Sequence, residues 1–582
     1  MTSKEDLTNA KIAKLLRNVA AAYAVKGGNF FKVTAYQKAA DAIEHATSEV
    51  KDLWDDNKLD QLPGVGLAIR SHLDELFRTG RVRHFENVMK GLPSGMFNIL
   101  GVPGIGPKTA FKLASTLGIE NIDELEDAAN QGKISKIAGF GEKSQKEILE
   151  SIAEFRRLSG RHLLPIAYEN ASKVIDYLIK IPEVIRADPL GSLRRMVATV
   201  GDIDIAVAAY DSTKVIKHFI GFPEASRVLE AGKKTASIIL RNGLQVDLMV
   251  QKPEGYGALL QHFTGSKQHN IHLRQLALSQ GMSLSEYGIR VGERLEIFDT
   301  EENFYKRIGL DWIPPELRED MGEIEAAMEH TLPDLVRLDQ IRGDLHVHSS
   351  YPIETSHDYG THGFELLINK AIELGYEYLG FSDHNPSVSE HTEDQVVALI
   401  KKRKTIIEQY NYSSKINLLN LLEVDILADG RLALPSKAFD YLDGIIAGVH
   451  SSMRQPKDVM TNRLLKAIAN PFVTIISHPT GRLLKEREGY ELDWPRIFSA
   501  CLQYNKILEI NAWPSRLDLP DVIVRDAVRQ GIKLIINTDS HAVEHMDNMK
   551  YGVAVARRGW AEAKNIINTL PWLAFRKYFM LK

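Results

Sequence analysis

Cysteine is nearly missing from this sequence, which contains a single one, Cys501. One thiol cannot close a disulfide within the chain, so a disulfide-stapled secreted fold is excluded. A chain without that framework suits a reducing compartment, and we expect the protein to work in the cytoplasm.

Long hydrophobic runs and low-complexity tracts are missing as well. The first 25 residues are polar and then helix-periodic, and they lack the apolar segment and cleavage site of a secretory signal. No apolar run is long enough to span a bilayer, so no membrane partner is expected. The net charge is −4, with 72 Lys and Arg against 76 Asp and Glu, which by itself does not indicate a nucleic-acid partner.

The length of 582 residues predicts three or more domains, because one hydrophobic core rarely grows so large. Apolar residues recur at helical spacing through residues 1–155, and strand-like runs follow between about 185 and 250. The proline-containing, charge-rich stretch 311–335 is typical of a connector. From 343 onward seven strand-like segments alternate with helical ones, which predicts a parallel barrel or an open α/β sheet.

A short element recurs in the helical part: "LPGVG" at 62–66, "VPGIG" at 102–106, and a weaker copy, "IAGFG", at 137–141. In each, a Gly-apolar-Gly turn precedes an amphipathic helix. The apolar residue anchors the turn in the core, and the backbone amides of the turn are left at the helix N-terminus, where they can bind a phosphate. The alternative is that these are ordinary Pro-Gly turns, which commonly connect helices without any binding role. The repetition favours helix-hairpin-helix modules, which bind a nucleic-acid backbone without reading bases. The expected DNA contacts are Gly64, Gly66, Gly104 and Gly106.

Two aspartates separated by one residue, Asp202 and Asp204, follow a small-residue turn and two arginines in "GSLRRMVATVGDIDIAV". Residues two apart in a strand share a face, and Asp247 in "LQVDLMV" has the same alternation, so three carboxylates are expected on one side of adjacent strands. An oxygen-only cluster of this kind suits Mg²⁺ or Mn²⁺, and two such ions can clamp the oxygens of a phosphoryl transfer. The turn offers Gly191 and Ser192 as a close-approach point, and Arg195 as a bidentate phosphate contact. The alternative is a pair of surface aspartates beside a turn.

Residues that bind metals end most of the strand-like segments after 343. A lone buried histidine is more often a satisfied core residue than a ligand, but ligand-type residues at consecutive strand ends converge on one mouth of an α/β barrel. Mixed imidazole and carboxylate ligands suit Mn²⁺, Zn²⁺ or Fe²⁺. The "ILEINA" segment supplies Glu509 and Asn511 instead. The candidate ligands are His346, His348, His384, Glu423, His450, His478, Asp539 and His541.

The first 318 residues closely resemble family X DNA polymerases, through "GSLRR…GDIDI", "VDLMV", "FTGSKQHN" (263–270) and "SEYGIR" (285–290) in the family's order. The resemblance implies a lyase-like helical domain, fingers, palm and thumb, and makes the three aspartates the catalytic metal ligands for nucleotidyl transfer. It implies further contacts by position. They are Gly191, Ser192, Arg195 and Gly201 on the triphosphate side, Phe263 and Gly265 at the sugar, and Asn270 and Arg274 in the minor groove.

Three positions depart from that family's pattern. His262 stands where the family has a tyrosine before Phe263, a position that bears on ribonucleotide discrimination. His72 stands where animal members have the Schiff-base lysine, and a sugar aldehyde needs an amine to condense with, so 5′-deoxyribose-phosphate lyase activity is not assigned. Lys267 lies where some relatives have an acidic residue, and its charge would strengthen nucleotide binding.

Residues 341–582 resemble the polymerase-and-histidinol-phosphatase (PHP) domain, through "DLHVHSSY", "SDH", "GVHSS", "ISHPTGR" and "TDSHA". That resemblance implies three metal ions on a distorted seven-stranded barrel and phosphoester hydrolysis by metal-activated water. Many members have a Ser-Asp-Gly aspartate after the first His pair. Here His357 is the expected ligand, with Asp358 as the alternative. Arg482 is a candidate phosphate anchor or an ordinary surface arginine.

The expected architecture is therefore multidomain: helical helix-hairpin-helix domains, an α+β nucleotidyltransferase palm with a thumb, and a distorted (β/α)7 PHP barrel. The expected order is a lyase-like domain (1–85), fingers (86–155), palm (156–252), thumb (253–318), linker (319–340) and PHP domain (341–582).

The resemblance implies a monomeric gap-filling DNA repair polymerase that uses dNTPs and gapped or primer-template DNA. It implies Mg²⁺ or Mn²⁺ at the palm, and three Mn²⁺, Zn²⁺ or Fe²⁺ ions in a barrel with 3′–5′ exonuclease activity. The alternatives are cleavage at abasic sites, 3′-phosphodiesterase or small-molecule phosphatase activity in the barrel, or a DNA-binding scaffold with an inactive palm.

Overall fold

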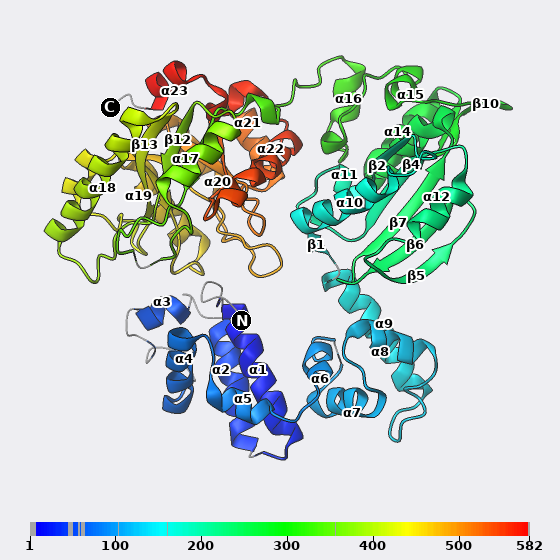
Figure 1. Ribbon diagram of the computed structural model, residues 1–582, viewed down its shortest axis with the longest axis horizontal. Coiled ribbons are helices and arrows are strands. Elements are labelled where there is room, and N and C mark those ends of the chain that lie inside the picture. The colour runs from blue at the N-terminus through cyan, green and yellow to red at the C-terminus, as the bar shows by residue number, and fades with distance from the viewer. Residues whose placement is uncertain are drawn as a thin grey trace. The chain divides into compact units, whose positions relative to one another are not determined.

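A computed structural model describes residues 7, 9–28, 30–44, 50–55, 59, 65–102, 104–159, 161–355 and 357–579 (Figure 1). The chain divides into two compact units. The first comprises residues 1–160 with the segments 450–460 and 485–490, and the second comprises 161–449, 461–484 and 491–582.

The first unit is helical, as the sequence predicts, and has two separate cores. Leu16, Leu73 and Phe85 belong to one core, and Ile99 and Leu113 to the other. The helices are α1 (Asn9–Val25), α2 (Phe30–Glu44), α3 (Val50–Asp55), α4 (Leu67–Thr79), α5 (Arg83–Met89), α6 (Ser94–Ile99), α7 (Pro107–Leu117), α8 (Ile122–Asn130) and α9 (Glu142–Ser159).

The second unit begins with a five-stranded sheet of order β2-β4-β7-β6-β5. Strand β4 pairs parallel with β7, and the other neighbours pair antiparallel. Strands β4, β6 and β7 cover the runs "DIDIAVAAY", "TASIILR" and "LQVDLMV" that the sequence predicts as strands, whereas no run was predicted for β2 or β5. The elements are β1 (His162–Leu163), α10 (Leu164–Leu178), β2 (Arg186–Pro189), α11 (Gly191–Arg194), β3 (Thr199–Val200), β4 (Ile203–Ala208), α12 (Ser212–Phe219), β5 (Ala225–Ala231), β6 (Thr235–Leu240) and β7 (Gln245–Gln251).

A thumb-like region follows the sheet, with a three-stranded antiparallel sheet and its own hydrophobic core. Leu317, Ile324 and Leu335, from the expected connector and linker, are buried in this core. That stretch is therefore packed chain with a fixed position on the thumb. The elements are α13 (Tyr256–Thr264), α14 (Lys267–Ser279), β8 (Met282–Ser285), β9 (Gly288–Val291), β10 (Arg294–Glu296), α15 (Glu301–Arg307) and α16 (Glu323–Met328).

The last region is a seven-stranded parallel sheet whose strands follow one another in chain order. A parallel bridge between Val347 and Ser540 brings the first strand next to the end of the last, so the sheet nearly closes into a barrel. The predicted (β/α)7 barrel is confirmed. Its strands are β11 (Gly343–Val347), β12 (Tyr378–Phe381), β13 (Asn417–Asp425), β14 (Gly444–Gly448), β15 (Val473–Ile476), β16 (Ile507–Asn511) and β17 (Leu534–Asn537).

Helices alternate with these strands and surround them (Figure 1). The strands are buried along nearly their whole length, because helices cover the outside and side chains fill the inside. The helices are α17 (Phe364–Glu373), α18 (Glu393–Ser413), α19 (Lys457–Ala469), α20 (Trp494–Tyr504), α21 (Asp521–Arg529), α22 (Met549–Arg558) and α23 (Trp572–Phe579).

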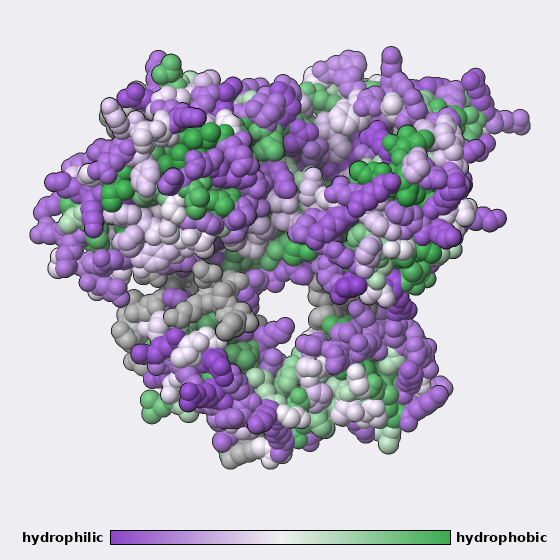
Figure 2. Space-filling model, in the orientation of Figure 1, coloured by the Kyte–Doolittle hydropathy of each residue, from purple (hydrophilic) through white to green (hydrophobic). Residues whose placement is uncertain are grey.

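Hydrophilic residues cover most of the face shown in Figure 2, with hydrophobic patches between them. Among the residues that the structure describes, no helix is both long and apolar enough to cross a membrane.

Candidate active sites

The three palm aspartates come together as the sequence predicts. Strand β4 begins at Ile203, so Asp202 lies in the turn before it, and Asp204 is paired in register with Asp247 on β7. One carboxylate oxygen of each aspartate lies within 4.8 Å of the other two. Gly191 takes φ +56°, and a Cβ there would stand 2.7 Å from Asp204 Oδ2, so a larger residue would crowd the triad.

The three carboxylates of this triad repel one another, and no positive charge in the cluster offsets that repulsion among the described residues. Burial, and then the carboxylates of Asp202 and Asp247, raise the pKa of Asp204 to about 7. Gln245 Nε2 donates to both oxygens of Asp247, at 3.1 and 3.0 Å. A divalent cation would remove the repulsion, and an all-oxygen donor set fits Mg²⁺ or Mn²⁺.

Arg195 faces the loop after α13. Its guanidinium donates to Thr264 O at 2.5 Å and to Glu319 Oε1 at 2.9 Å. A Cβ on Gly265 would stand 3.1 Å from Arg195 Nη1, so this glycine permits the approach. Ser192 lies in the short helix α11, and Gly201 directly precedes Asp202.

Phe263 and His262 end α13, and their rings meet edge-on with centroids 4.8 Å apart. Asn270 on α14 donates to His262 O at 2.7 Å and accepts from Gln261 Nε2 at 2.9 Å, which fixes it against the end of α13. Arg274 lies one turn further along α14 and is exposed.

A buried ion triad behind this region was not predicted from the sequence. Arg194 Nη2 lies 2.7 Å from Glu301 Oε2, and Arg318 Nη1 lies 2.6 Å from Glu301 Oε1. Arg194 also donates to Thr264 Oγ1 at 2.6 Å. The triad therefore ties the turn beside the aspartates to the thumb.

The hairpins have the predicted geometry where the structure describes them. Val65 and Ile105 are buried anchors, and Gly66 and Gly106 are the N-caps of α4 and α7. A Cβ on either cap glycine would meet nothing within 4 Å, so both caps face open space. Gly104 takes φ +79°, whereas Gly64 lies outside the described residues.

A ring cluster occupies the position of the expected lyase lysine. His72 Nδ1 lies 3.1 Å from the Tyr36 hydroxyl, and its ring stacks on His84 at 4.6 Å. His84 in turn lies 2.8 Å from the Tyr23 hydroxyl. Burial, and then the charge of His84, lower the pKa of His72. No amine stands at position 72 to form a Schiff base.

The mouth of the barrel gathers the second set of candidate ligands. Glu423 is central: its Oε2 lies 3.1 Å from His346 Nε2 and 3.3 Å from His384 Nδ1, and its Oε1 lies 2.8 Å from His478 Nε2. His348 Nε2 lies 3.2 Å from Asp539 Oδ1. Each of four groups has ligand atoms within 4.8 Å of one another. They are His346–His348–Asp539, Glu423–His450–His478, His348–His384–His541 and His357–His384–Asp425–His450.

These nitrogens have the environment of metal ligands. His346 Nε2, both ring nitrogens of His348 and His541 Nε2 are buried and make no hydrogen bond. Burial alone raises the pKa of Asp539, but the surrounding His346, His348 and His541 outweigh it and hold that pKa well below its usual value. Buried imidazoles facing carboxylates fit Mn²⁺, Zn²⁺ or Fe²⁺.

A second layer of hydrogen bonds orients the ligands. Glu509 Oε1 lies 2.7 Å from His346 Nδ1 and accepts from Asn537 Nδ2 at 2.9 Å. Asn511 Nδ2 donates to Asp539 Oδ2 at 3.1 Å. The "ILEINA" strand therefore supplies orienting partners, which commonly fix the tautomer and direction of a ligand.

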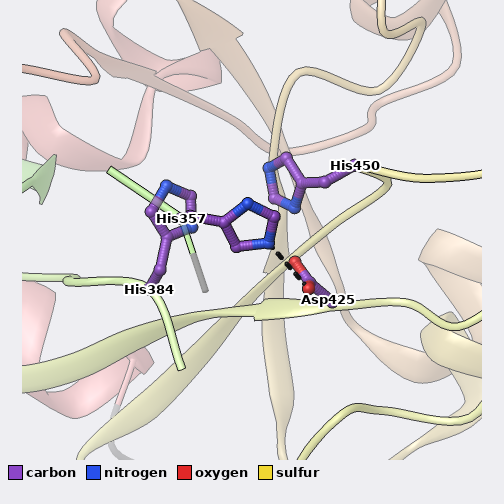
Figure 3. A group of neighbouring side chains, drawn as sticks. All are labelled: His357, His384, Asp425 and His450. Atoms are coloured by element: carbon purple, nitrogen blue, oxygen red, sulfur yellow. Dashed lines mark hydrogen bonds and ion pairs between the residues drawn. The ribbon is translucent and has the colours of Figure 1, made fainter. Parts of the chain in front are cut away.

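The structure brings both candidates for the ligand after the first His pair, His357 and Asp358, to the mouth. Asp358 has one oxygen 3.5 Å from His384 Nε2 and the other 3.2 Å from His541 Nε2. His357 Nε2 instead lies 2.8 Å from Asp425 Oδ2, beside His384 and His450 (Figure 3). Asp425 was not predicted, although it lies two residues after Glu423 on β13, and this spacing on a strand indicates a shared face.

The Arg516 guanidinium lies close to one of the ligands. Arg482 donates to the carbonyls of Arg516 and Leu517, which braces the loop after β16. Arg516 Nε lies 3.7 Å from Asp539 Oδ2, and its Nη1 is buried and makes no hydrogen bond.

The fold and these two clusters define a polymerase joined to a metal-dependent phosphoesterase barrel. Comparisons with known proteins agree. Residues 259–319 match the DNA polymerase beta thumb, residues 7–82 a helix-hairpin-helix domain, and residues 98–154 a SAM-like helix-hairpin-helix tandem.

The chain is 35% identical to the DNA polymerase/3′-5′ exonuclease PolX of Bacillus subtilis (strain 168), over 96% of each chain. It therefore belongs to the PolX family, the bacterial family X DNA polymerases with a C-terminal PHP domain. Two further relatives each match part of it. DNA polymerase lambda of Arabidopsis thaliana is 25% identical over 49% of this chain and 57% of its own. A probable phosphatase of Thermoanaerobacter sp. (strain X514) is 25% identical over 39% of this chain and 89% of its own.

Proposed function

We propose that this protein fills short gaps in DNA with dNTPs at the palm and removes nucleotides from DNA 3′ ends at the barrel mouth. The cluster of Asp202, Asp204 and Asp247, at the start of β4 and on β7, carries the first half of the proposal, because an all-carboxylate cluster suits nucleotidyl transfer. Residues 259–319 match a polymerase thumb, which supports DNA as the template.

At the palm, this chain's own residues bind and orient. Asp202, Asp204 and Asp247 hold divalent cations, Mg²⁺ or Mn²⁺ by their donor set. Arg195, held at Thr264 O, presents a cation toward the incoming triphosphate. Phe263 and Asn270, fixed at the junction of α13 and α14, line the sugar and base side.

At the barrel, nine candidate ligands share three ions: His346, His348, His357, His384, Glu423, His450, His478, Asp539 and His541. Asp358 competes with His357 for one position, because it contacts both His384 and His541. Arg516 binds the phosphate being cut, since its buried Nη1 has no protein hydrogen-bond partner. Bound cations supply charge neutralisation at the palm and an activated water at the barrel.

The hairpins bind the DNA backbone without sequence preference, because Gly66 and Gly106 leave the amides of their helix N-termini open. The protein acts as a monomer.

The test uses a labelled primer on one-nucleotide-gapped DNA with Mn²⁺, with and without dNTPs. Asp202→Ala/Asp204→Ala should only shorten the primer, and His346→Ala/His348→Ala should only extend it. Shortening by the second variant would show that the barrel is not the nuclease. Failure of the intact protein to extend would reject the polymerase.

A second candidate for the barrel is a small-molecule phosphatase, favoured by the match to most of a probable phosphatase. Hydrolysis of a phosphomonoester such as p-nitrophenyl phosphate, without release of nucleotides from a DNA 3′ end, would support it.

A further inference from the structure

Several side chains of the barrel helix α22 contact the palm: Tyr551 and Lys550 pack on the ring of Tyr168, and an arginine reaches the turn that carries Arg195. Arg558, the last residue of α22, has a side chain that is only 8% exposed. Its Nε donates to Asp521 Oδ2 at 2.7 Å, and its Nη1 donates to Glu319 Oε1 at 3.0 Å. One guanidinium therefore joins the start of α21, within the barrel, to Glu319 in the thumb-like region.

The same arginine also holds Arg195. Arg558 Nη1 donates to the backbone carbonyl of Arg195 at 2.8 Å. Glu319 Oε1, which accepts from Arg558, also accepts from Arg195 Nε at 2.9 Å. Arg195 is thus fixed at its backbone by Arg558 and at its side chain by a carboxylate that Arg558 shares.

This shared oxygen is one of two acceptors that hold the Arg195 guanidinium; the other is Thr264 O. Two cations on one oxygen of Glu319 divide its charge, so Arg195 is oriented without being fully neutralised. Burial by itself lowers the pKa of Arg558, but Asp521 and Glu319 outweigh it, so this guanidinium remains a charged donor in its buried place. Without Arg558, Glu319 would pair with Arg195 alone and the turn carrying Arg195 would lose its backbone donor.

The surrounding contacts give this relay a rigid base. Arg557 Nε donates to Glu316 Oε1 at 2.7 Å, and Val336 N donates to Ala561 O at 2.9 Å. Trp560 packs against the thumb core. The end of α22 and the chain around Glu319 therefore form one packed body, in which Arg558 and Glu319 both contact Arg195.

We propose that Arg558, a residue of the nuclease barrel, is a positioning residue for nucleotide binding at the palm. It acts through Arg195, whose guanidinium it orients toward the incoming triphosphate by way of Glu319. The inference rests on the proposed polymerase function, and it makes dNTP affinity dependent on an intact barrel.

The test compares Arg558→Ala with Arg557→Ala, its matched control. Arg557 makes contacts of the same kind, to Glu316 Oε1 and Val336 O, but none that reaches Arg195. Single-nucleotide gap filling over a range of dNTP concentrations gives KM and kcat for each full-length variant. Arg558→Ala should raise the KM for dNTP roughly tenfold, within the range usual for coupling between sites, with a smaller change in kcat. Arg557→Ala should leave KM near the wild-type value.

Two further variants separate positioning from folding. Arg558→Lys keeps the charge and should recover part of the affinity. Glu319→Gln should raise the KM for dNTP by itself. Because both residues act on one interaction, the change in binding free energy of Glu319→Gln/Arg558→Ala should be smaller than the sum of the two single-variant changes. Nuclease activity of the same preparations reports whether the barrel is folded.

The outcomes are distinct. A wild-type protein that does not extend primers rejects the proposed function. A wild-type protein that extends, with equal KM for Arg558→Ala and Arg557→Ala, overturns the role of Arg558. Should Arg558→Ala not fold, a wild-type KM in both Arg558→Lys and Glu319→Gln would overturn it too.

Discussion

Replacing Glu301 with glutamine should destabilise the thumb and increase its local unfolding. Its carboxylate, 4% exposed, receives Arg194 Nη2 at 2.7 Å and the fully buried Arg318 Nη1 at 2.6 Å. Trp312 Nε1 also donates to it, at 3.3 Å. Glutamine keeps the shape of the side chain and removes the charge, so the two guanidinium groups stay buried with a neutral partner.

The pKa of Glu301 sets the size of the effect. Burial alone raises it, but Arg318 and Arg194 outweigh burial and lower the pKa from 4.5 to about 2. A shift of that size corresponds to about 3 kcal/mol of stability, in line with the cost of breaking a buried ion pair. Because the folded-state pKa is depressed, this stability is fully present above about pH 4.5 and is lost as pH falls through about 2.

Hydrogen–deuterium exchange of peptides from residues 259–319 measures the local opening free energy. Glu301→Gln should reduce protection there roughly 100-fold at pH 7, which corresponds to the loss of about 3 kcal/mol. The melting temperatures of the variant and the wild type should converge as pH is lowered from about 4.5 toward 2.

The control is Glu296→Gln. Glu296 Oε2 accepts from Arg307 Nε at 2.6 Å, but the two side chains are 22% and 37% exposed, so solvent screens this pair and its loss should change protection little. Equal protection in the two variants would refute the argument that the buried triad stabilises the thumb.

Other consequences concern the barrel and the palm. Arg516→Ala should lower nuclease activity roughly 100-fold and weaken binding of a DNA 3′ end, while metal content by mass spectrometry stays unchanged; loss of metal would instead make it a ligand-supporting residue. Gly257→Ala should destabilise the second unit by about 2 kcal/mol or more, because a Cβ there would stand 2.2 Å from the Thr300 carbonyl carbon, and an unchanged thermal melt would contradict this. Chelation of divalent ions should lower the melting temperature of the wild type but not of His346→Ala/His348→Ala, since an ion at roughly a hundred times its Kd adds about 3 kcal/mol.

Much of the fold was predictable because its signals are local. The Gly-apolar-Gly turns buried Val65 and Ile105 as expected, and the seven strand-like segments formed a parallel barrel in chain order. The alternation around Asp204 and Asp247 placed both on one face, and the parallel pairing of their strands set them in register. Strands β2 and β5, by contrast, were missed.

The residues of the candidate sites were likewise predictable where the signal is local and not elsewhere. Strand ends supplied His346, His348, Glu423 and Asp539, because the carboxyl ends of parallel strands meet at one mouth. For the loop after β11, the sequence could not decide which of two adjacent residues is the ligand. Adjacent His357 and Asp358 both reach the mouth, and only their partners, Asp425 for one and His384 with His541 for the other, separate them.

The sequence by itself determined which elements form and which side chains gather at strand ends and turns, since hydrophobic periodicity and turn chemistry act over a few residues. The tertiary structure alone decided which distant charges meet. Glu301 receives Arg194 and Arg318, Arg516 approaches Asp539 among the barrel ligands, and Arg558 reaches Arg195. These pairings depend on how packed elements approach one another. The sequence around a charged residue on a helix or loop does not indicate which distant residue will pair with it.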